Sequence, residues 1–92
     1  MLSFSNNKNG KYSIVCKNTG NLILEKNYLN NLLHGDYIYY WDNGQIRFSG
    51  KFVENKRVGT WFNYDKQGNI IFKESYIWFL YFIFDIIKKG WI

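Results

Sequence analysis

A chain of 92 residues provides one domain at most and buries only a modest fraction of its surface. Aromatic residues make up 22% of the composition and proline is absent, which favours strands over helices. The net charge of +5 comes from scattered basic residues, with only Lys56-Arg57 and Lys88-Lys89 adjacent, which indicates a generally basic surface and argues against a nucleic-acid patch.

The N-terminal residues 1–9 are polar and rich in asparagine, and we expect them to form a loose lead-in. They lack the apolar core of a signal peptide, so we expect a cytoplasmic protein, with association with a membrane as the alternative. The stretch from Gly10 to Gly20 resembles two better-preserved copies further along, but it carries one extra residue and lacks their second aromatic residue. Terminal units of repeat arrays are often atypical in this way.

The chain repeats itself with a period of 24 residues. The clearest copies are residues 35–44, GDYIYYWDNG, and residues 59–68, GTWFNYDKQG, in which glycine and aromatic residues occupy the same places. Other positions with this spacing are Gly20, Gly44 and Gly68, and Tyr28, Phe52 and Tyr76. An internal repeat of this length predicts a row of similar supersecondary units, here about 10–34, 35–58 and 59–76.

Each unit has the pattern of a β-hairpin. Asn43-Gly44 predicts a two-residue turn, because both central positions of that turn need a positive φ. Residues 45–52 then alternate between apolar and polar, which predicts a half-buried antiparallel strand. The expected faces are Ile46, Phe48 and Phe52 on one side and Arg47, Ser49 and Lys51 on the other. Residues 30–35 and 54–59 are expected to form looser turns between the units.

The even period has a consequence for the rows of side chains. Equivalent residues can keep the same face, so Ile46 with Ile70 and Phe48 with Phe72 are expected to form continuous rows. Tyr37 and Tyr40 lie three apart and would point to opposite faces of a regular strand. Either both faces carry aromatic residues or a β-bulge re-aims one of the two.

The repeated pattern is Gly-x-aromatic-x-x-Tyr-x-x-x-Gly, followed by an apolar strand, a Gly or polar residue, an aromatic residue and an Asn/Lys turn that ends in Gly. The matching residues are Gly35, Tyr37, Tyr40, Asn43, Gly44, Gly50, Phe52, Asn55, Lys56, Gly59, Trp61, Tyr64, Gly68 and Tyr76. This pattern resembles the MORN repeat in its bacterial variant form. The resemblance is good over 35–76, weaker over 10–33 and absent elsewhere.

The resemblance implies an all-β fold, an antiparallel meander of about three 24-residue hairpin units in an elongated single-layer sheet. It also implies binding or scaffolding rather than catalysis, and we expect neither enzymatic activity nor a cofactor. Bacterial proteins with such repeats are often labelled antitoxins of toxin–antitoxin systems, of the YwqK type, and MORN proteins have been associated with membrane surfaces and partner assembly. We therefore expect a protein-interaction module with a protein partner, with an antitoxin as one form of it.

Residues 77–92 depart from the repeat. The apolar stretch from Tyr76 to Phe84 is too short for a membrane span, which takes about 20 residues. It fits a buried closing element, strand or helix, or the stub of a longer array. The functional alternative is a peripheral membrane-binding module, with aromatic side chains at headgroup depth and lysines against anionic lipid. The candidate membrane contacts are Trp78, Phe79, Phe82, Lys88, Lys89 and Trp91.

The candidate partner-binding residues are all aromatic: Tyr37, Tyr39, Trp41 and Trp61. Aromatic side chains that a one-layer sheet cannot bury form patches suited to a partner. They can also pack on one another, and the repeat favours that interpretation for Tyr37. Tyr39 and Trp41 stand apart, because their counterparts in the next copy are Asn63 and Asp65.

The sequence contains no convincing catalytic or metal constellation. His34 flanks a turn glycine with no second His or Cys nearby, so a surface role is favoured over a metal ligand. The single Cys16 excludes an internal disulfide and fits a small apolar strand residue. Three aspartates lie beside glycines, where short acceptors stabilise turns. Binding of single-stranded nucleic acid by stacking is not favoured, because no basic groove is apparent.

Overall fold

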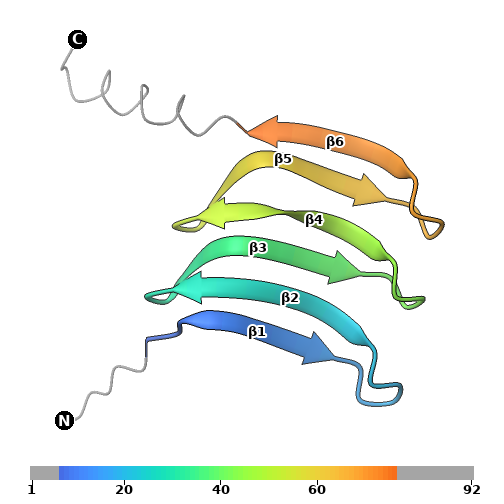
Figure 1. The fold of residues 1–92 in the computed structure, drawn as a ribbon, viewed down its shortest axis with the longest axis horizontal. Helices are drawn as coiled ribbons and strands as arrows, with labels where there is room; N and C mark the ends of the chain where they lie inside the picture. Colours follow the sequence, from blue (N-terminus) through green and yellow to red (C-terminus); the bar gives the residue numbers. More distant parts are fainter. Residues whose placement is uncertain (1–6, 77–92) are drawn as a thin grey trace.

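In the computed structural model, residues 7–76 are described, and they form one antiparallel sheet of six strands in sequential order (Figure 1). The strands are β1 (Gly10–Val15), β2 (Leu22–Leu29), β3 (Leu32–Tyr40), β4 (Ile46–Val53), β5 (Lys56–Tyr64) and β6 (Ile70–Tyr76). The principal-axis extents are 53 × 46 × 13 Å, and the last of these is the thickness of a single layer. The predicted all-β meander of hairpins is therefore confirmed.

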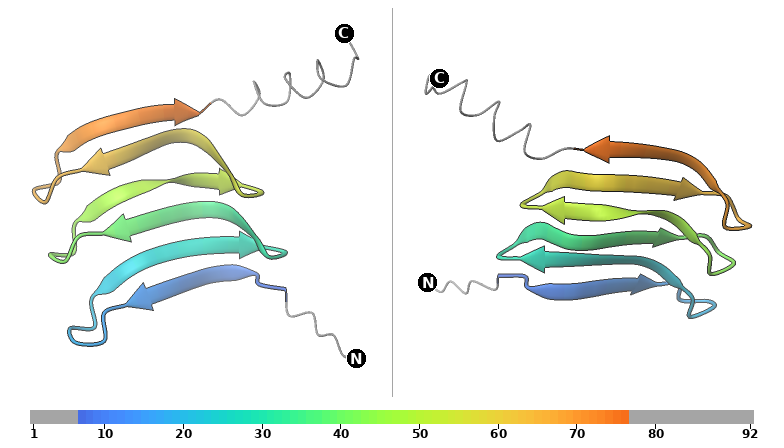
Figure 2. Two further views of the ribbon diagram at one scale, coloured as in Figure 1. Left: turned by 180° about the vertical axis from the view of Figure 1, so that it is seen from behind. Right: turned by 45° about the horizontal axis from the view of Figure 1, so that its top comes forward.

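The sheet is open, with β1 along one edge and β6 along the other (Figure 1). All strands curve in the same sense, so the layer is bent rather than flat (Figure 2). The hairpins are β1–β2, β3–β4 and β5–β6, and the turns between them fall at residues 30–31 and 54–55. The second and third hairpins thus begin three residues before the glycine that marks the repeat in the sequence, at Leu32 and Lys56, whereas β1 begins at Gly10 itself.

The tight two-residue turns lie between the hairpins, where the sequence led us to expect looser ones. Asn30 and Asn31 have φ values of 50° and 70°, and Glu54 and Asn55 have φ values of 48° and 68°. Two successive residues with positive φ match the right-handed twist of the strands they join. Asparagine tolerates this conformation better than other non-glycine residues, which explains its place at both turns.

The Asn43-Gly44 turn is longer than predicted, so its assignment as a two-residue turn is wrong. Residues 41–45 separate β3 from β4, and Gly44, with a φ of 88°, is the residue among them with positive φ. The backbone N–H of Gly44 donates to Trp41 O at 3.1 Å, and that of Trp41 donates to Gln45 O at 2.8 Å. Asn43 instead uses its side chain, whose Oδ1 accepts the N–H of Gln45 at 3.0 Å. The Asn thus stabilises the turn without adopting positive φ.

A turn asparagine closes the open end of the first two hairpins. The N–H of Asn55 donates to Leu33 O at 2.9 Å, and the N–H of Leu33 donates back to Asn55 Oδ1 at 2.7 Å. Asn31 repeats the arrangement on Lys8, with distances of 3.0 Å and 2.6 Å. One asparagine therefore satisfies both the backbone N–H and the backbone C=O of a residue at or just before the start of the hairpin's first strand. We call this pairing the asparagine clamp.

The clamp predicts a graded response at Asn55. Asn55→Gly should keep the turn and lose the hydrogen bond from Leu33, costing about 1 kcal/mol of unfolding free energy. Asn55→Ala should cost about 2 kcal/mol, because alanine also strains the left-handed backbone. Urea unfolding of the two variants measures both values. Equal destabilisation by Gly and Ala would contradict the role of backbone strain, and no loss in Asn55→Gly would contradict the clamp.

The two faces of β4 differ from the predicted alternation at Ile46. Phe48 and Phe52 share a face with Tyr37 and Trp61, as ring contacts show, whereas Ile46 lines a hollow on the other side with Ile38 and Phe62. The cause is a register shift next to Tyr40, where β4 carries an extra residue opposite β3. The expected grouping of Ile46 with Phe48 is therefore wrong.

The predicted continuous row from Phe48 to Phe72 is also interrupted. In the ladder, Phe48 pairs with Asn63, and Asn63 pairs with Phe72, so a polar side chain lies between the two rings. Tyr37 and Tyr40 do occupy opposite faces, because Tyr40 bonds Glu25 whereas Tyr37 pairs with the adjacent Lys26. Both faces of the sheet therefore carry aromatic residues.

The most deeply buried side chain of the described sheet is the indole of Trp61, which lies against a glycine. Between the pairs Ser49–Phe62 and Lys51–Val58, Gly50 faces residues 59–61 of β5. A Cβ at Gly50 would lie 2.0 Å from Cδ2 of Trp61, so the glycine is what lets the indole lie against the backbone. The rings of Tyr37, Phe48 and Phe52 surround it with centroid distances of 5.0–6.0 Å. Trp61 is 1% exposed as a result.

Candidate functional site

The structure divides the four candidate aromatic residues into two groups. Trp61 is buried and Tyr37 is half-buried, and they pack against each other with ring centroids 6.0 Å apart. These two residues belong to the core, and Trp61 offers no surface to a partner. Tyr39, which is 36% exposed, and the half-buried Trp41 lie instead at the end of β3 and in the turn after it.

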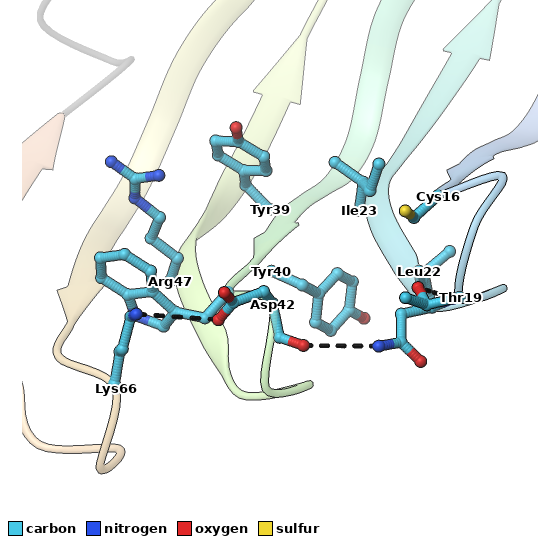
Figure 3. A pocket seen from close by; sticks show the side chains of 11 residues that line it. Cys16, Thr19, Leu22, Ile23, Tyr39, Tyr40, Asp42, Arg47 and Lys66 are labelled. Carbon is cyan, nitrogen blue, oxygen red and sulfur yellow. Dashed lines mark hydrogen bonds and ion pairs between the residues drawn. The ribbon is translucent and has the colours of Figure 1, made fainter.

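Tyr39 and Trp41 line a hollow of about 430 Å³ at the 41–45 turn (Figure 3). It is lined from the hairpins β1–β2 and β3–β4 and from the turn after β5. The lining residues are Cys16, Thr19, Asn21, Leu22, Ile23, Tyr39, Tyr40, Trp41, Asp42, Arg47 and Lys66. We call this surface the Tyr39 hollow. Its volume falls within the range of ligand pockets, and it is large enough to take a side chain of a partner.

Two cations lie over the aromatic rings of this hollow. The guanidinium carbon of Arg47 is 4.4 Å from the Trp41 ring centroid and 5.3 Å from that of Tyr39. Lys66 Nζ is 5.4 Å from the Trp41 ring and 3.7 Å from Asp42 Oδ1. These cation–π contacts place positive charge beside exposed apolar surface.

The turn that carries Trp41 is hydrogen-bonded to the neighbouring turns on both sides. The indole Nε1 of Trp41 donates to Tyr64 O at 3.0 Å, and the neighbouring Asn43 Nδ2 donates to Lys66 O at 2.9 Å. Asn21 Nδ2 reaches Asp42 O from the other side at 3.4 Å (Figure 3). Trp41 therefore helps to join its turn to the turn after β5. Of the two rings, Tyr39 is the one that stays accessible.

Cys16 and Thr19 form the rim of the hollow on the β1–β2 side (Figure 3). The hydrogen bond from the Thr19 side chain lowers the pKa of the Cys16 thiol, with smaller contributions from backbone N–H groups of Thr19 and Asn18. The thiol is free and half-buried. Cys16 lines the same hollow as Tyr39 and Arg47, which makes it a natural place for a reporter label.

Tyr40 contributes the most tightly bonded group near the hollow. Its hydroxyl donates to Glu25 Oε1 at 2.6 Å, and Lys11 Nζ lies 3.3 Å from Glu25 Oε2. Burial and the hydrogen bond to Glu25 raise the pKa of Tyr40 to about 12. The Tyr40 hydroxyl, and to a lesser extent Lys11, lower the pKa of Glu25 from its usual 4.5.

The Tyr40–Glu25 pair predicts that the free energy of unfolding falls in two pH ranges, an acidic limb and an alkaline limb. Glu25 has a lowered folded pKa, so its contribution is present above pH 4.5 and is lost as the pH falls below that value. Tyr40 has a raised folded pKa, so its contribution is present below its usual 10.0 and is lost as the pH rises toward 12. Urea unfolding across pH should show that Tyr40→Phe flattens both limbs relative to wild type. Parallel wild-type and variant curves would contradict the coupling.

Sequence reasoning missed the charged partners of the hollow. Arg47 and Lys66 come from β4 and from the turn after β5, and their contacts with Trp41 depend on the meander register, which no local pattern reveals. Within residues 7–76, no group of three His, Cys, Asp or Glu side chains could hold a metal ion. The searched part of the chain also contains no helix long and apolar enough to cross a membrane.

Six predicted membrane contacts lie outside the described residues: Trp78, Phe79, Phe82, Lys88, Lys89 and Trp91. Comparison of the chain with protein-family models, with curated proteins and with solved structures found no match.

Proposed function

We propose that this chain is a non-catalytic, MORN-like repeat module that binds a protein partner through the Tyr39 hollow. The observation that carries the proposal is Tyr39 itself, an exposed ring beside Ile23 with the Arg47 guanidinium over it. Tyrosine, tryptophan and arginine are the residues that dominate binding energy at protein interfaces. A hollow with apolar walls and two cations suits a partner segment that presents an apolar side chain next to a carboxylate.

The repeat geometry supports the MORN-like part of the proposal. Gly35 and Gly59, 24 residues apart, both adopt positive φ, with values of 107° and 70°. Asn31 and Asn55, also 24 apart, make the same clamp. Repeat arrays of this kind present an extended surface whose exposed positions vary while the structural ones recur. Tyr39 and Trp41 are such positions, because Asn63 and Asp65 replace them in the next unit.

The first experiment compares capture by wild type with capture by a hollow variant. Tyr39→Ala and Arg47→Ala should each lower the affinity for the partner by roughly tenfold or more. Val53→Ala is the matched control, because Val53 is exposed at the opposite end of β4 and should bind as wild type does. Quantitative affinity purification from the source cells identifies the partner, and calorimetry with the purified pair measures the loss. Equal capture by wild type and both hollow variants would overturn the proposal.

An antitoxin is the specific form of this module that the resemblance favours. Co-expression with the adjacent reading frame tests it, since an antitoxin should restore growth that a toxin arrests. Tyr39→Ala should weaken the rescue and Val53→Ala should not. Rescue by both variants to the same extent would place the interaction elsewhere on the chain.

A second candidate function is peripheral membrane binding. It rests on the net charge of +5 and on the aromatic and basic residues of the sequence 77–92. Flotation with vesicles containing anionic lipid should then bring up the wild-type chain at low salt and lose it at high salt. Replacing both Lys88 and Lys89 by Glu should abolish flotation, whereas Lys56→Glu and Arg57→Glu together provide a charge-matched control. Flotation that ignores salt and lipid charge would exclude this candidate.

A further inference from the structure

Strand β6 leaves apolar side chains exposed, whereas the equivalent side chain one period earlier is covered by a neighbouring strand. Ile71 and Phe72 are 64% and 57% exposed, whereas Phe48, which occupies the slot of Phe72 one period earlier, is half-buried against Trp61. Among the strands of residues 7–76, β6 is the last in the order, so one row of its backbone N–H and C=O groups faces away from β5. Such an edge is a template for a further strand.

The β4–β5 pair shows which strand would fit this template. Phe48 and Phe52 of β4 hold the ring of Trp61 on β5, each with a centroid distance of 5.0 Å. One period later, β6 carries Phe72 and Tyr76 with the same four-residue spacing. The fitting strand therefore contains glycine, any residue and an aromatic ring in succession, as β3 and β5 do from Gly35 and Gly59, the fourth residue of each strand.

The strand β1 has this pattern, because Gly10 and Tyr12 stand where β5 has Gly59 and Trp61. Within the described part of the chain, β1 is the other edge strand of the sheet, and its Tyr12 and Ile14 are 40% and 46% exposed. The edges are far apart in one molecule, on opposite sides of the sheet (Figure 1). A β1 strand can therefore reach β6 only from a second copy of the chain.

The register of such a pair follows from the existing ladders. In the ladder between β2 and β3, Leu24 pairs with Tyr39 and Lys26 pairs with Tyr37. Phe72 and Glu74 lie two periods after Leu24 and Lys26, and Ile14 and Tyr12 take the places of Tyr39 and Tyr37 in β1. The same pairing therefore places Phe72 opposite Ile14, and Glu74 opposite Tyr12, of the second copy. The pair of Lys26 with Tyr37 shows that a long side chain fits opposite a tyrosine at this position of the ladder. A tryptophan at the same position, Trp61, instead needs a glycine, Gly50, on the neighbouring strand. Glu74 therefore does not obstruct the second copy's Tyr12.

At this junction Glu74 supplies a carboxylate for the second copy's Lys8, beside Arg57, which already donates to the Tyr76 hydroxyl at 3.1 Å. Arg57 lies over the rings of Trp61 and Tyr76, and Lys8 lies likewise over Tyr12 and Tyr28, at 5.9 Å and 5.0 Å. The second copy's Lys8 would thus arrive opposite Tyr76, whose hydroxyl donates to Glu74 Oε1 at 2.8 Å. A diagonal neighbour on the same face of a sheet lies within reach of a lysine side chain.

From this match of slots and charge, we propose that the β6 edge of one copy binds the β1 edge of a second copy, which extends the meander head to tail. The contact is heterologous, so it leaves a free edge at each end and adds copies in a row. One strand pair is smaller than the roughly 1,200–2,000 Å² of a stable interface, so the assembly is weak and depends on concentration. It is separate from the Tyr39 hollow and does not require the proposed function.

The test uses sedimentation velocity of the full chain from about 10 μM to about 1 mM, the range of weak association. Wild type should form oligomers that grow with concentration. Phe72→Lys blocks β6 and Ile14→Lys blocks β1, and each should be monomeric, because an edge lysine opposes strand pairing. Mixing the two variants should produce a one-to-one dimer, since each retains the edge that the other has lost.

Several outcomes would overturn the proposal. A wild-type chain that stays monomeric at about 1 mM means that β6 is covered by other residues of its own chain or accepts no strand. Dimers in Ile14→Lys but not in Phe72→Lys mean symmetric pairing of two β6 edges, and the converse means pairing of two β1 edges. Ile71→Lys and Val15→Lys form a second pair of variants, at the most exposed apolar residue of each edge, should either first variant fail to fold. Circular dichroism of each variant verifies the fold.

Discussion

Replacing Gly50 with alanine should destabilise the protein by about 3 kcal/mol or more. The added Cβ would meet three indole atoms of Trp61 at 2.0, 2.2 and 2.5 Å, so the ring has to leave its position. Overpacking a tight core costs about 1–3 kcal/mol where neighbours can adjust, and a rigid indole held between three other rings has little freedom to do so. Thermal and urea unfolding should show a large loss with an unchanged strand signature at low temperature.

The pairing of β2 with β3 suggests a second substitution that should rescue this variant. Tyr37 takes the place of Trp61 one period earlier, and it pairs with Lys26, a residue with a long side chain. Gly50→Ala combined with Trp61→Tyr should therefore be more stable than the sum of the two single losses predicts. Ser49→Ala, next to Gly50 on the opposite face, is the control for strand propensity. Strict additivity in the double variant would show that the clash with the indole is not the cause.

Trp61→Ala should cost about 3–5 kcal/mol, the range for deleting a buried tryptophan ring. This is a large share of the roughly 5–15 kcal/mol that holds a typical domain together. Trp61 is 1% exposed and contacts Tyr37, Phe48 and Phe52, so its removal leaves three rings without their common neighbour. Unfolding by urea, followed by tyrosine fluorescence and circular dichroism, measures the loss.

Trp41→Ala is the matched control for this prediction. Trp41 is half-buried and its ring contacts are cations rather than other rings, so we expect about 1–2 kcal/mol. Trp61→Phe adds a second comparison, because Trp61 Nε1 has no hydrogen-bond partner among the described residues. Phenylalanine removes that unpaired donor and should cost much less than alanine. Similar losses in Trp41→Ala and Trp61→Ala would contradict the assignment of Trp61 as the core.

The meander could be predicted from the sequence because the 24-residue period recurs over most of the chain. What the period did not reveal was which turn is tight. Asn43-Gly44 carries the stronger local signal, yet the tight turns form at Asn30-Asn31 and Glu54-Asn55, where the clamp satisfies the start of the hairpin. A local rule counts residue types, whereas the number of residues between paired strands is set by the register of the whole sheet.

The candidate site could be predicted only in part. The break in the repeat at Tyr39 and Trp41 indicated residues that now lie around one hollow, whereas the contribution of Arg47 required the ladder. Trp61 was grouped with the partner-binding residues, although Gly50 was a usable signal against this. A glycine within an alternating strand marks a close approach by a neighbouring group, and here that group is the indole.

The asparagine clamp has a consequence for how such a chain changes over evolution. Each clamp joins the turn after a hairpin to the start of that same hairpin, as Asn55 does with Leu33, so it makes no demand on more distant strands. A duplication or deletion of 24 residues that includes both ends of one hairpin leaves every other clamp intact. The array can thus lengthen or shorten by whole hairpins, and the first hairpin, which spans one residue more between its clamped ends than the second, shows that a clamp also tolerates a one-residue insertion within its hairpin.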